Sequence, residues 1–312
     1  MKPLRIAVIA GGSSPEASVS RSSAAEVAKA LRATFSTVIQ LELDAGLTAA
    51  LGAAAPDVVF PVLHGPPGED GTIQGYLDIL GYRYVGSGVL ASATAMDKSV
   101  AKAVFRQAGL PVCEDLVFPP GANAAEAART TVARLGERVV IKPRRQGSAL
   151  GVTPVMNGGD LQRPFEAALA FGDGVLVEPF VLGHEITVGV LDLAGEPETV
   201  FPPIEVRTPA GSWYDFQHRY TQGESEHLVP APLEASVGAR VCEIALEAHR
   251  SLGCRDLSRA DFIVGDDDSV VLLEVNTLPG MTPTSLFPDG ARAIGISFER
   301  LVEQLVESAA RR

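Results

Sequence analysis

The segment RADFIVGDDDSVVLLEVN, residues 259–276, constrains the fold more than any other part of this 312-residue sequence. Two apolar runs flank a polar stretch, Gly265–Ser269, which predicts two antiparallel strands joined by a turn. Because side chains alternate between the faces of a strand, Glu274 and Asn276 are expected on one face. A carboxylate buried there without a partner costs several kcal/mol, so the hairpin needs a group that compensates it. The side chains expected on the opposite face are Val271, Leu273 and Val275.

A divalent cation is the natural partner for this face of the hairpin. Pairing about the middle of the turn places Asp261 across from Glu274 to within about one position. Two carboxylates ~4 Å apart repel by ~4 kcal/mol at an effective dielectric of 20, and a cation between them converts repulsion into attraction. Asp261, Glu274 and Asn276 offer only oxygen atoms, which suits Mg²⁺ or Mn²⁺ and, through Mg²⁺, a nucleoside triphosphate. A hairpin with one solvated face remains the alternative, since antiparallel sheets commonly have one.

Length and charge limit the class of protein. The chain is long enough for two or three domains, and its net charge of −12 argues against a nucleic-acid-binding surface. The first apolar run is too short for a signal peptide, and no segment approaches ~20 uninterrupted apolar residues. The three cysteines fit no zinc or disulfide spacing. These features predict a cytoplasmic enzyme.

The order of apolar runs predicts an α/β organisation. Strand-like runs at 4–10 and 57–65 alternate with helical patterns, and a short strand is expected at 82–87, which together predict a parallel sheet with helices on its faces. After about residue 96 the pattern changes to an amphipathic helix and then to strands at 139–143 and 175–180. Further strands and helices near 234–252 and 297–310 complete the chain.

Two further segments suggest a nucleotide site, although each is a weak signal alone. Lys142 ends an apolar strand, and Ser148 follows in the small-residue loop GSALG, whose backbone N–H groups suit phosphate oxygens. Glu178 and Glu185 flank the apolar hinge in EPFVLGHE, where they fit contacts to adenine and ribose. An ordinary surface turn and two surface carboxylates explain the same residues equally simply.

Eight motifs in order resemble one family over residues 4 to about 305, the D-alanine–D-alanine ligases. They are AGGSSPEASVS, LHGPPGEDGTIQG, YVGSGVLASATAMDK, IKPRRQGSALGV, EPFVLGHEITVGV, YDFQHRY, SRADFIV and LLEVNTLPGMTPTSL. The resemblance implies a three-domain ATP-grasp fold with α/β and α+β elements. Its expected domains are an N-terminal parallel-sheet domain at 1–95, a central domain at 96–180 and a C-terminal domain at 181–312.

The resemblance also implies a reaction and its participants. The carboxylate of one D-alanine attacks the γ-phosphate of ATP, and the amine of a second D-alanine attacks the resulting acyl phosphate. D-Alanyl-D-alanine for peptidoglycan precursors is the expected product, ATP the cosubstrate, two Mg²⁺ or Mn²⁺ ions the cofactors and a homodimer the expected assembly.

Five catalytic residues follow from the resemblance. Glu16 is expected to bind the ammonium group of the first D-alanine, and Ser148 and Tyr220 to handle protons from the attacking amine. Arg259 and the backbone N–H of Gly280 are expected to stabilise developing negative charge. From the residues alone, Glu16 also fits a carboxylate at a helix start, Tyr220 a packing aromatic and Arg259 a salt-bridge partner.

The remaining site residues carried over by the resemblance bind ligands. The predicted ATP contacts are Lys98, Lys142, Glu178, Val181 and Glu185. The predicted contacts of the two D-alanines are His64, Glu69, Ser285 and Leu286. The predicted metal ligands are Asp261, Glu274 and Asn276. A buried imidazole with satisfied hydrogen bonds is an equal alternative for His64.

Three other functions compete with this prediction. A related ligase that uses D-serine or D-lactate as second substrate keeps the fold, although Tyr220 favours an amine nucleophile. A dinucleotide-binding oxidoreductase is disfavoured because AGGSS lacks the G-x-G-x-x-G pattern. A non-catalytic relative is disfavoured because it has no physical need for the acidic hairpin.

Overall fold

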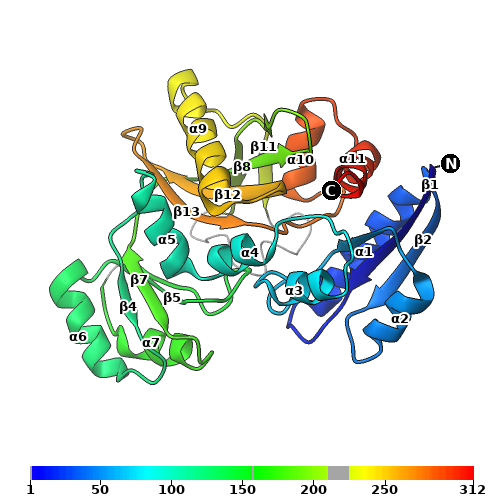
Figure 1. Cartoon of the computed structure of the whole chain (residues 1–312). Helices are drawn as coiled ribbons and strands as arrows, with labels where there is room; N and C mark the ends of the chain where they lie inside the picture. Colours follow the sequence, from blue (N-terminus) through cyan, green and yellow to red (C-terminus); the bar gives the residue numbers. More distant parts are fainter. Residues whose placement is uncertain (1, 157, 210–224) are drawn as a thin grey trace.

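The computed structural model describes residues 2–156, 158–209 and 225–312 (Figure 1). In these ranges the chain forms three sheets with helices packed on them, and the acidic hairpin lies between the other two sheets (Figure 1). None of the described helices combines the length and the apolar character needed to cross a membrane.

The first sheet is parallel, as the sequence predicts, with strand order β2-β1-β3. Its elements are β1 (Lys2–Ala10), α1 (Ala17–Leu31), β2 (Phe35–Glu42), α2 (Leu47–Ala54), β3 (Val58–Pro61) and α3 (Thr72–Ile79). Ile6 and Val8 belong to a core shared with α1, whereas Ala7 and Ile9 belong to a core shared with α2 and α3. Burial of both faces explains why β1 reads as a continuous apolar run.

The prediction of a strand at 82–87 is wrong. Only one bridge forms there, between Val59 and Tyr84. The chain leaves the sheet at Gly86, whose φ of +100° is outside the extended region, and its N–H donates to Asp256 Oδ2 at 2.8 Å. A contact with the third sheet thus replaces a fourth strand.

The second sheet is antiparallel, with strand order β4-β7-β5-β6. Its elements are β4 (Leu116–Phe118), α6 (Ala124–Leu135), β5 (Val139–Pro143), β6 (Thr153–Val155), α7 (Gln162–Leu169) and β7 (Val175–Pro179). Phe118 and Phe165 meet edge to face, with ring centroids 5.1 Å apart, inside the core beneath α6 and α7. This sheet carries two of the predicted site residues. Lys142 lies on β5, and Ser148 lies in the loop between β5 and β6.

The third sheet is antiparallel and carries the hairpin. Its strands are β8 (His184–Asp192), β9 (Thr199–Val200), β10 (Ile204–Arg207), β11 (Glu226–Leu228), β12 (Asp256–Val264) and β13 (Val270–Asn276), in the order β11-β10-β8-β12-β13 with β9 beside β8. One face packs on α4 (Val89–Met96), α5 (Lys98–Gln107) and α9 (Ala235–Leu252), the other on α10 (Leu286–Ala293) and α11 (Phe298–Ala310). The α4–α5 pair spans the predicted limit at residue 95/96, and the domain limits themselves stay predictions.

Candidate active site

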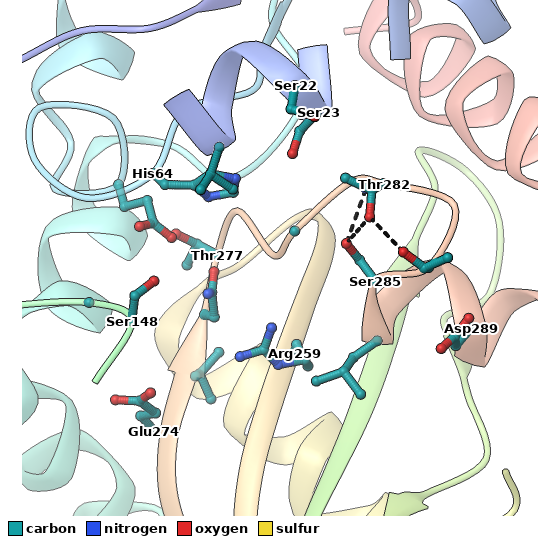
Figure 2. A pocket seen from close by; sticks show the side chains of 18 of the residues that line it. Ser22, Ser23, His64, Ser148, Arg259, Glu274, Thr277, Thr282, Ser285 and Asp289 are labelled. Atoms are coloured by element: carbon teal, nitrogen blue, oxygen red, sulfur yellow. Dashed lines mark hydrogen bonds between the residues drawn. The ribbon is translucent and has the colours of Figure 1, made fainter. Parts of the chain in front are cut away.

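A cavity of about 810 Å³ opens where the loops of the three sheets meet (Figure 2). Figure 2 shows His64, Ser148 and Glu274 on one side, Thr282 and Ser285 on the other, and Arg259 between them. The predicted site residues that line it are His64, Glu69, Lys98, Ser148, Arg259, Glu274, Asn276, Gly280, Ser285 and Leu286. The predicted residues that stand outside its lining are Glu16, Lys142, Glu178, Val181, Glu185 and Asp261. Tyr220 lies outside the described residues.

The hairpin register places the two carboxylates opposite each other. Asp261 pairs with Glu274, as the sequence predicts to within one position. This pairing depends on a bulge at Leu273. The three pairs nearest the turn, from Val264–Val270 to Phe262–Leu272, are symmetric about it, and Leu273 is the extra residue before the Asp261–Glu274 pair. Without the extra residue, Asp261 would face Leu273.

Because of the bulge, the side chains of β13 that face the core differ from those predicted. Val270, Leu272 and Val275 share one buried core, although Leu272 and Val275 are three positions apart. The expectation that Val271 and Leu273 belong with Val275 is therefore wrong, since both are only half-buried. A bulge resets the alternation of a strand, and a sequence pattern of period two cannot reveal it.

Each hairpin carboxylate has a cationic neighbour. Arg259 donates from Nε and Nη2 to the two oxygens of Asp261, at 2.8 and 2.7 Å, so the salt bridge considered for Arg259 is present. Thr187 Oγ1 donates to Asp261 Oδ1 at 2.7 Å, and Lys98 Nζ lies 3.3 Å from Glu274 Oε2. Each of the two hairpin carboxylates is thus paired with a cationic side chain.

The donor atoms of the hairpin fit a hard divalent cation. Asp261 and Glu274 are direct neighbours across the two strands, and Asn276 lies two positions beyond Glu274. The Asn276 Oδ1 accepts the N–H of Leu278 at 2.9 Å, which fixes the amide and leaves its second lone pair. An oxygen-only set with two carboxylates is the kind that Mg²⁺ takes, usually together with phosphate oxygens.

A buried charge cluster surrounds Lys142, one of the predicted ATP contacts. Lys142 and Lys102 pair with different oxygens of Glu178, and Lys102 Nζ also lies 3.7 Å from Asp115 Oδ1. Burial alone would raise the pKa of Glu178, but the two lysine charges outweigh it and hold that pKa below its usual range. Burial lowers the pKa of Lys102. Burial also opposes the charge on Lys142, but the charge and hydrogen bond of Glu178, together with the charge of Glu274, outweigh it and raise the pKa of Lys142.

A second group of buried acids lies where the first sheet approaches the loop after β5. Ser148 Oγ donates to Glu16 Oε1. Glu16 is the residue before α1 and makes no side-chain capping bond there. Glu69 Oε2 accepts the N–H of Gly65 at 2.6 Å. Both carboxylates approach the same glycine of the loop, Gly147.

The pKa values of Glu69 and His64 follow burial. Burial raises the pKa of Glu69 to about 8, although the hydrogen bond from Gly65 opposes the shift, and the charge of Glu16 adds to it. Burial also lowers the pKa of His64. Within the described chain, His64 Nε2 is buried without a hydrogen-bond partner, which disfavours the alternative of a satisfied imidazole.

The loop before α10 closes the far side of the cavity. Thr282 N donates to Ser285 Oγ at 3.1 Å, and the two hydroxyls lie 2.8 Å apart (Figure 2). A Cβ added at Gly280 would lie 3.0 Å from Ser285 Oγ, a tight contact that requires the hydroxyl to shift. Leu286 begins α10 beside them.

Two predicted nucleotide contacts, Val181 and Glu185, follow β7 where the chain passes from the second sheet into the third. Val181 is in the connection that joins β7 to β8, and Glu185 is the second residue of β8, paired with Val206 and Ile263 of its neighbours. Glu178 at the end of β7 leads into the same connection.

Sequence reasoning missed Lys102, Asp97 and Thr187. Lys102 follows Lys98 by four positions, so both lie on one face of α5, and a pair of lysines on the buried face of an amphipathic helix was the available signal. Asp97 caps α5 and contacts two arginines of the loop after β5. Thr187 lies across from Asp261 on β8, which only the sheet order reveals.

Fold and site together define a member of the ATP-grasp proteins, with a parallel N-terminal sheet and two antiparallel sheets that enclose a cavity. The chain belongs to the D-alanine–D-alanine ligase family. Residues 44–87 match the family model described as D-ala D-ala ligase N-terminus, and residues 104–307 match that of the C-terminus. These matches confirm the resemblance drawn from the eight motifs.

Relatives match over almost the whole chain. D-Alanine–D-alanine ligases of Desulforudis audaxviator and Acidiphilium cryptum are 43% and 44% identical over 309 residues, covering 99% and 98% of this chain and the same shares of theirs. The ligase structure from Bacillus anthracis complexed with ATP has a TM-score of 0.84 and 30% identity, covering 99% of this chain and 98% of its own. A D-Ala:D-Ser ligase structure from Enterococcus faecalis has a TM-score of 0.83 and 29% identity, covering 99% and 100%.

Proposed function

We propose that this protein joins two D-alanines to D-alanyl-D-alanine with ATP, through a D-alanyl phosphate. The observation that carries the proposal is a set of contacts at the cavity wall. The lining residues Glu274 and Arg259 pair with Asp261, and the lining residue Ser148 donates a hydrogen bond to Glu16. Family membership and relatives that are 40–44% identical and named D-alanine–D-alanine ligase support it.

Magnesium binding is part of the proposal. Asp261, Glu274 and Asn276 would hold Mg²⁺ or Mn²⁺, since their oxygen donors share the hairpin face. When bound, the ions neutralise charge on the phosphates during transfer. Lys98 and Arg259, which neighbour the carboxylates, would then turn toward the anionic ligand.

The protein's own residues bind the two reacting ends. Lys98, Lys142 and the backbone N–H groups of loop 144–152 would hold the triphosphate, and Glu178, Val181 and Glu185 would hold the nucleoside. Glu16 would bind the ammonium of the first D-alanine, which sets its carboxylate toward the γ-phosphate. Burial raises the pKa of Glu69 to about 8, so this neighbour of Glu16 is neutral at pH 7.

The second half of the reaction needs an oxyanion site and a proton route. Arg259 and the N–H of Gly280 would stabilise the negative oxygen that forms when the amine attacks the acyl phosphate. Ser148, hydrogen-bonded to Glu16, would relay the amine proton together with Tyr220. Ser285 and Leu286 would hold the carboxylate of the second D-alanine. A cytoplasmic location and a homodimer remain predictions.

Phosphate release tests the proposed function. Protein with ATP and Mg²⁺ is mixed with D-alanine or with L-alanine, and phosphate and the mass of the product are measured. We expect phosphate and dipeptide in equal amounts with D-alanine and neither with L-alanine. Adding D-serine or D-lactate beside limiting D-alanine identifies the second substrate. Phosphate release that does not depend on D-alanine would contradict the proposal.

A further inference from the structure

Asp97 links the lysine-bearing helix α5 to the loop between β5 and β6. Its side chain is almost fully buried and begins α5 by accepting the N–H of Val100 at 3.4 Å. Asp97 Oδ1 also accepts Arg144 Nε at 2.6 Å, and Oδ2 accepts Arg145 Nε at 2.9 Å. One carboxylate therefore joins the first turn of α5 to two consecutive residues of the loop.

The loop that Asp97 holds has an unfavourable backbone conformation. Ser148 and Ala149 have φ angles of +49° and +58°, in the left-handed region that non-glycine residues avoid. Such residues persist only where surrounding contacts hold them. The Asp97 ion pairs at the start of the loop are contacts of this kind.

Lys98 belongs to the same arrangement. Its backbone N–H donates to Arg144 O at 3.2 Å, and its Nζ donates to Gln146 O at 2.6 Å. Lys98 and the loop therefore hold each other in place through these hydrogen bonds. Asp97 is the residue directly before Lys98. Burial would raise the pKa of Asp97, but hydrogen bonds from the two arginines outweigh it, so the carboxylate stays charged.

We propose that Asp97 is a positioning residue for the nucleotide, which fixes loop 144–152 against Lys98 before the triphosphate binds. The inference rests on the proposed function, because it takes the loop and Lys98 as the phosphate site. A loop held in place binds a ligand more tightly than one that must be ordered on binding. The competing role is that of a helix cap alone.

Asp97→Asn separates the two roles. Asparagine caps helices as well as aspartate does, but its amide lacks the charge and the second acceptor that the arginines use. We expect the Kd and KM for ATP to rise about 10-fold or more, with kcat changed less than threefold. A helix cap alone predicts an unchanged ATP affinity, and that result would overturn the proposal.

A second variant keeps the test valid if Asp97→Asn folds poorly. Arg144→Gln combined with Arg145→Gln removes the same contacts and leaves the cap untouched. It should weaken ATP binding by a similar factor, and adding Asp97→Asn to it should cause little further loss. Wild-type affinity in the double arginine variant would also overturn the proposal.

Asn123→Ala is the matched control. Asn123 caps α6 by accepting the N–H of Glu126 at 3.0 Å, away from the loop. This variant should lose stability while its ATP affinity stays within twofold of wild type. Nucleotide affinity is measured by calorimetry without D-alanine, so it remains informative if no dipeptide forms. Wild-type protein that binds no ATP would overturn both proposals, whereas unchanged affinity in Asp97→Asn with an active wild type would overturn only this one.

Discussion

Glu178 and Glu69 are both buried glutamates, yet the structure holds them in opposite charge states. Glu178 lies between Lys102 and Lys142, whose charges keep its pKa below the usual range despite burial. Glu69 meets a backbone N–H at Gly65, and burial raises its pKa to about 8. Burial therefore does not decide the charge of an acid. A cationic partner inside the same site does.

The difference separates the two ends of the site. At the end assigned to the nucleotide, Glu178, Asp261 and Glu274 each stand beside a lysine or an arginine. At the other end a neutral acid, Glu69, lies beside Glu16. Replacing a glutamate by glutamine keeps its shape and removes its charge, so the same substitution tests each position.

Glu274→Gln should have the largest effect, because the proposed metal ligand loses its charge. We expect dipeptide formation to fall at least roughly 1,000-fold, or about 4 kcal/mol in transition-state stabilisation. Calorimetry with and without Mg²⁺ should show that the magnesium-dependent part of ATP binding is lost. Magnesium-dependent binding at wild-type strength would contradict the placement of the metal.

Glu178→Gln should lower the free energy of unfolding by about 3–4 kcal/mol at pH 7. The substitution leaves Lys142 and the 1%-exposed side chain of Lys102 without their buried charge partner. Urea unfolding at pH 7 measures the change. Asp115 remains near Lys102 and still compensates part of its charge. The expected loss of unfolding free energy is therefore toward the lower end of the range that is usual for breaking a buried ion pair. A change below about 1 kcal/mol would mean that the cluster does not depend on this charge.

Glu69→Gln should raise the free energy of unfolding, and by no more than Glu178→Gln lowers it. The pKa of Glu69 rises from 4.5 to about 8 on folding, so its stability contribution is full below pH 4.5 and is lost as the pH rises toward 8. Glutamine does not titrate and avoids this loss. At pH 7 we expect the variant to gain about 3 kcal/mol over wild type.

The pH dependence is the control for this prediction. The difference between Glu69→Gln and wild type should shrink toward zero as the pH falls below 4.5, where Glu69 becomes protonated in both states. Urea unfolding at about pH 3.5, 5 and 7 follows it. A variant that is less stable than wild type at every pH would mean that Glu69 is charged in the folded protein.

Local patterns predict some parts of this molecule well. The run LRIAVIA predicts a strand buried on both faces, and Ile6 and Ala7 indeed face different cores. The turn at Gly265–Ser269 predicts the hairpin register closely enough to pair Asp261 with Glu274. Such features depend on neighbours in sequence, where periodicity is visible.

Other parts depend on contacts between distant segments. Lys102 meets Glu178 across 76 positions, and Asp97 meets Arg144 across 47. The bulge at Leu273 changes which side chains of β13 face the core, and no local spacing marks it. The metal-ligand role of Asp261, Glu274 and Asn276 follows from the hairpin itself, whereas most other roles came from the family resemblance. All of them stay predictions, and Tyr220 is outside the described part of the chain.

The central claim is that a carboxyl group is activated by phosphoryl transfer from ATP. D-Alanine labelled with ¹⁸O in its carboxylate tests it, because the bridging oxygen of the acyl phosphate leaves with the phosphate when the amine attacks. The account predicts one ¹⁸O atom in the released phosphate for each dipeptide formed, as measured by mass spectrometry. Unlabelled phosphate accompanying dipeptide would contradict it.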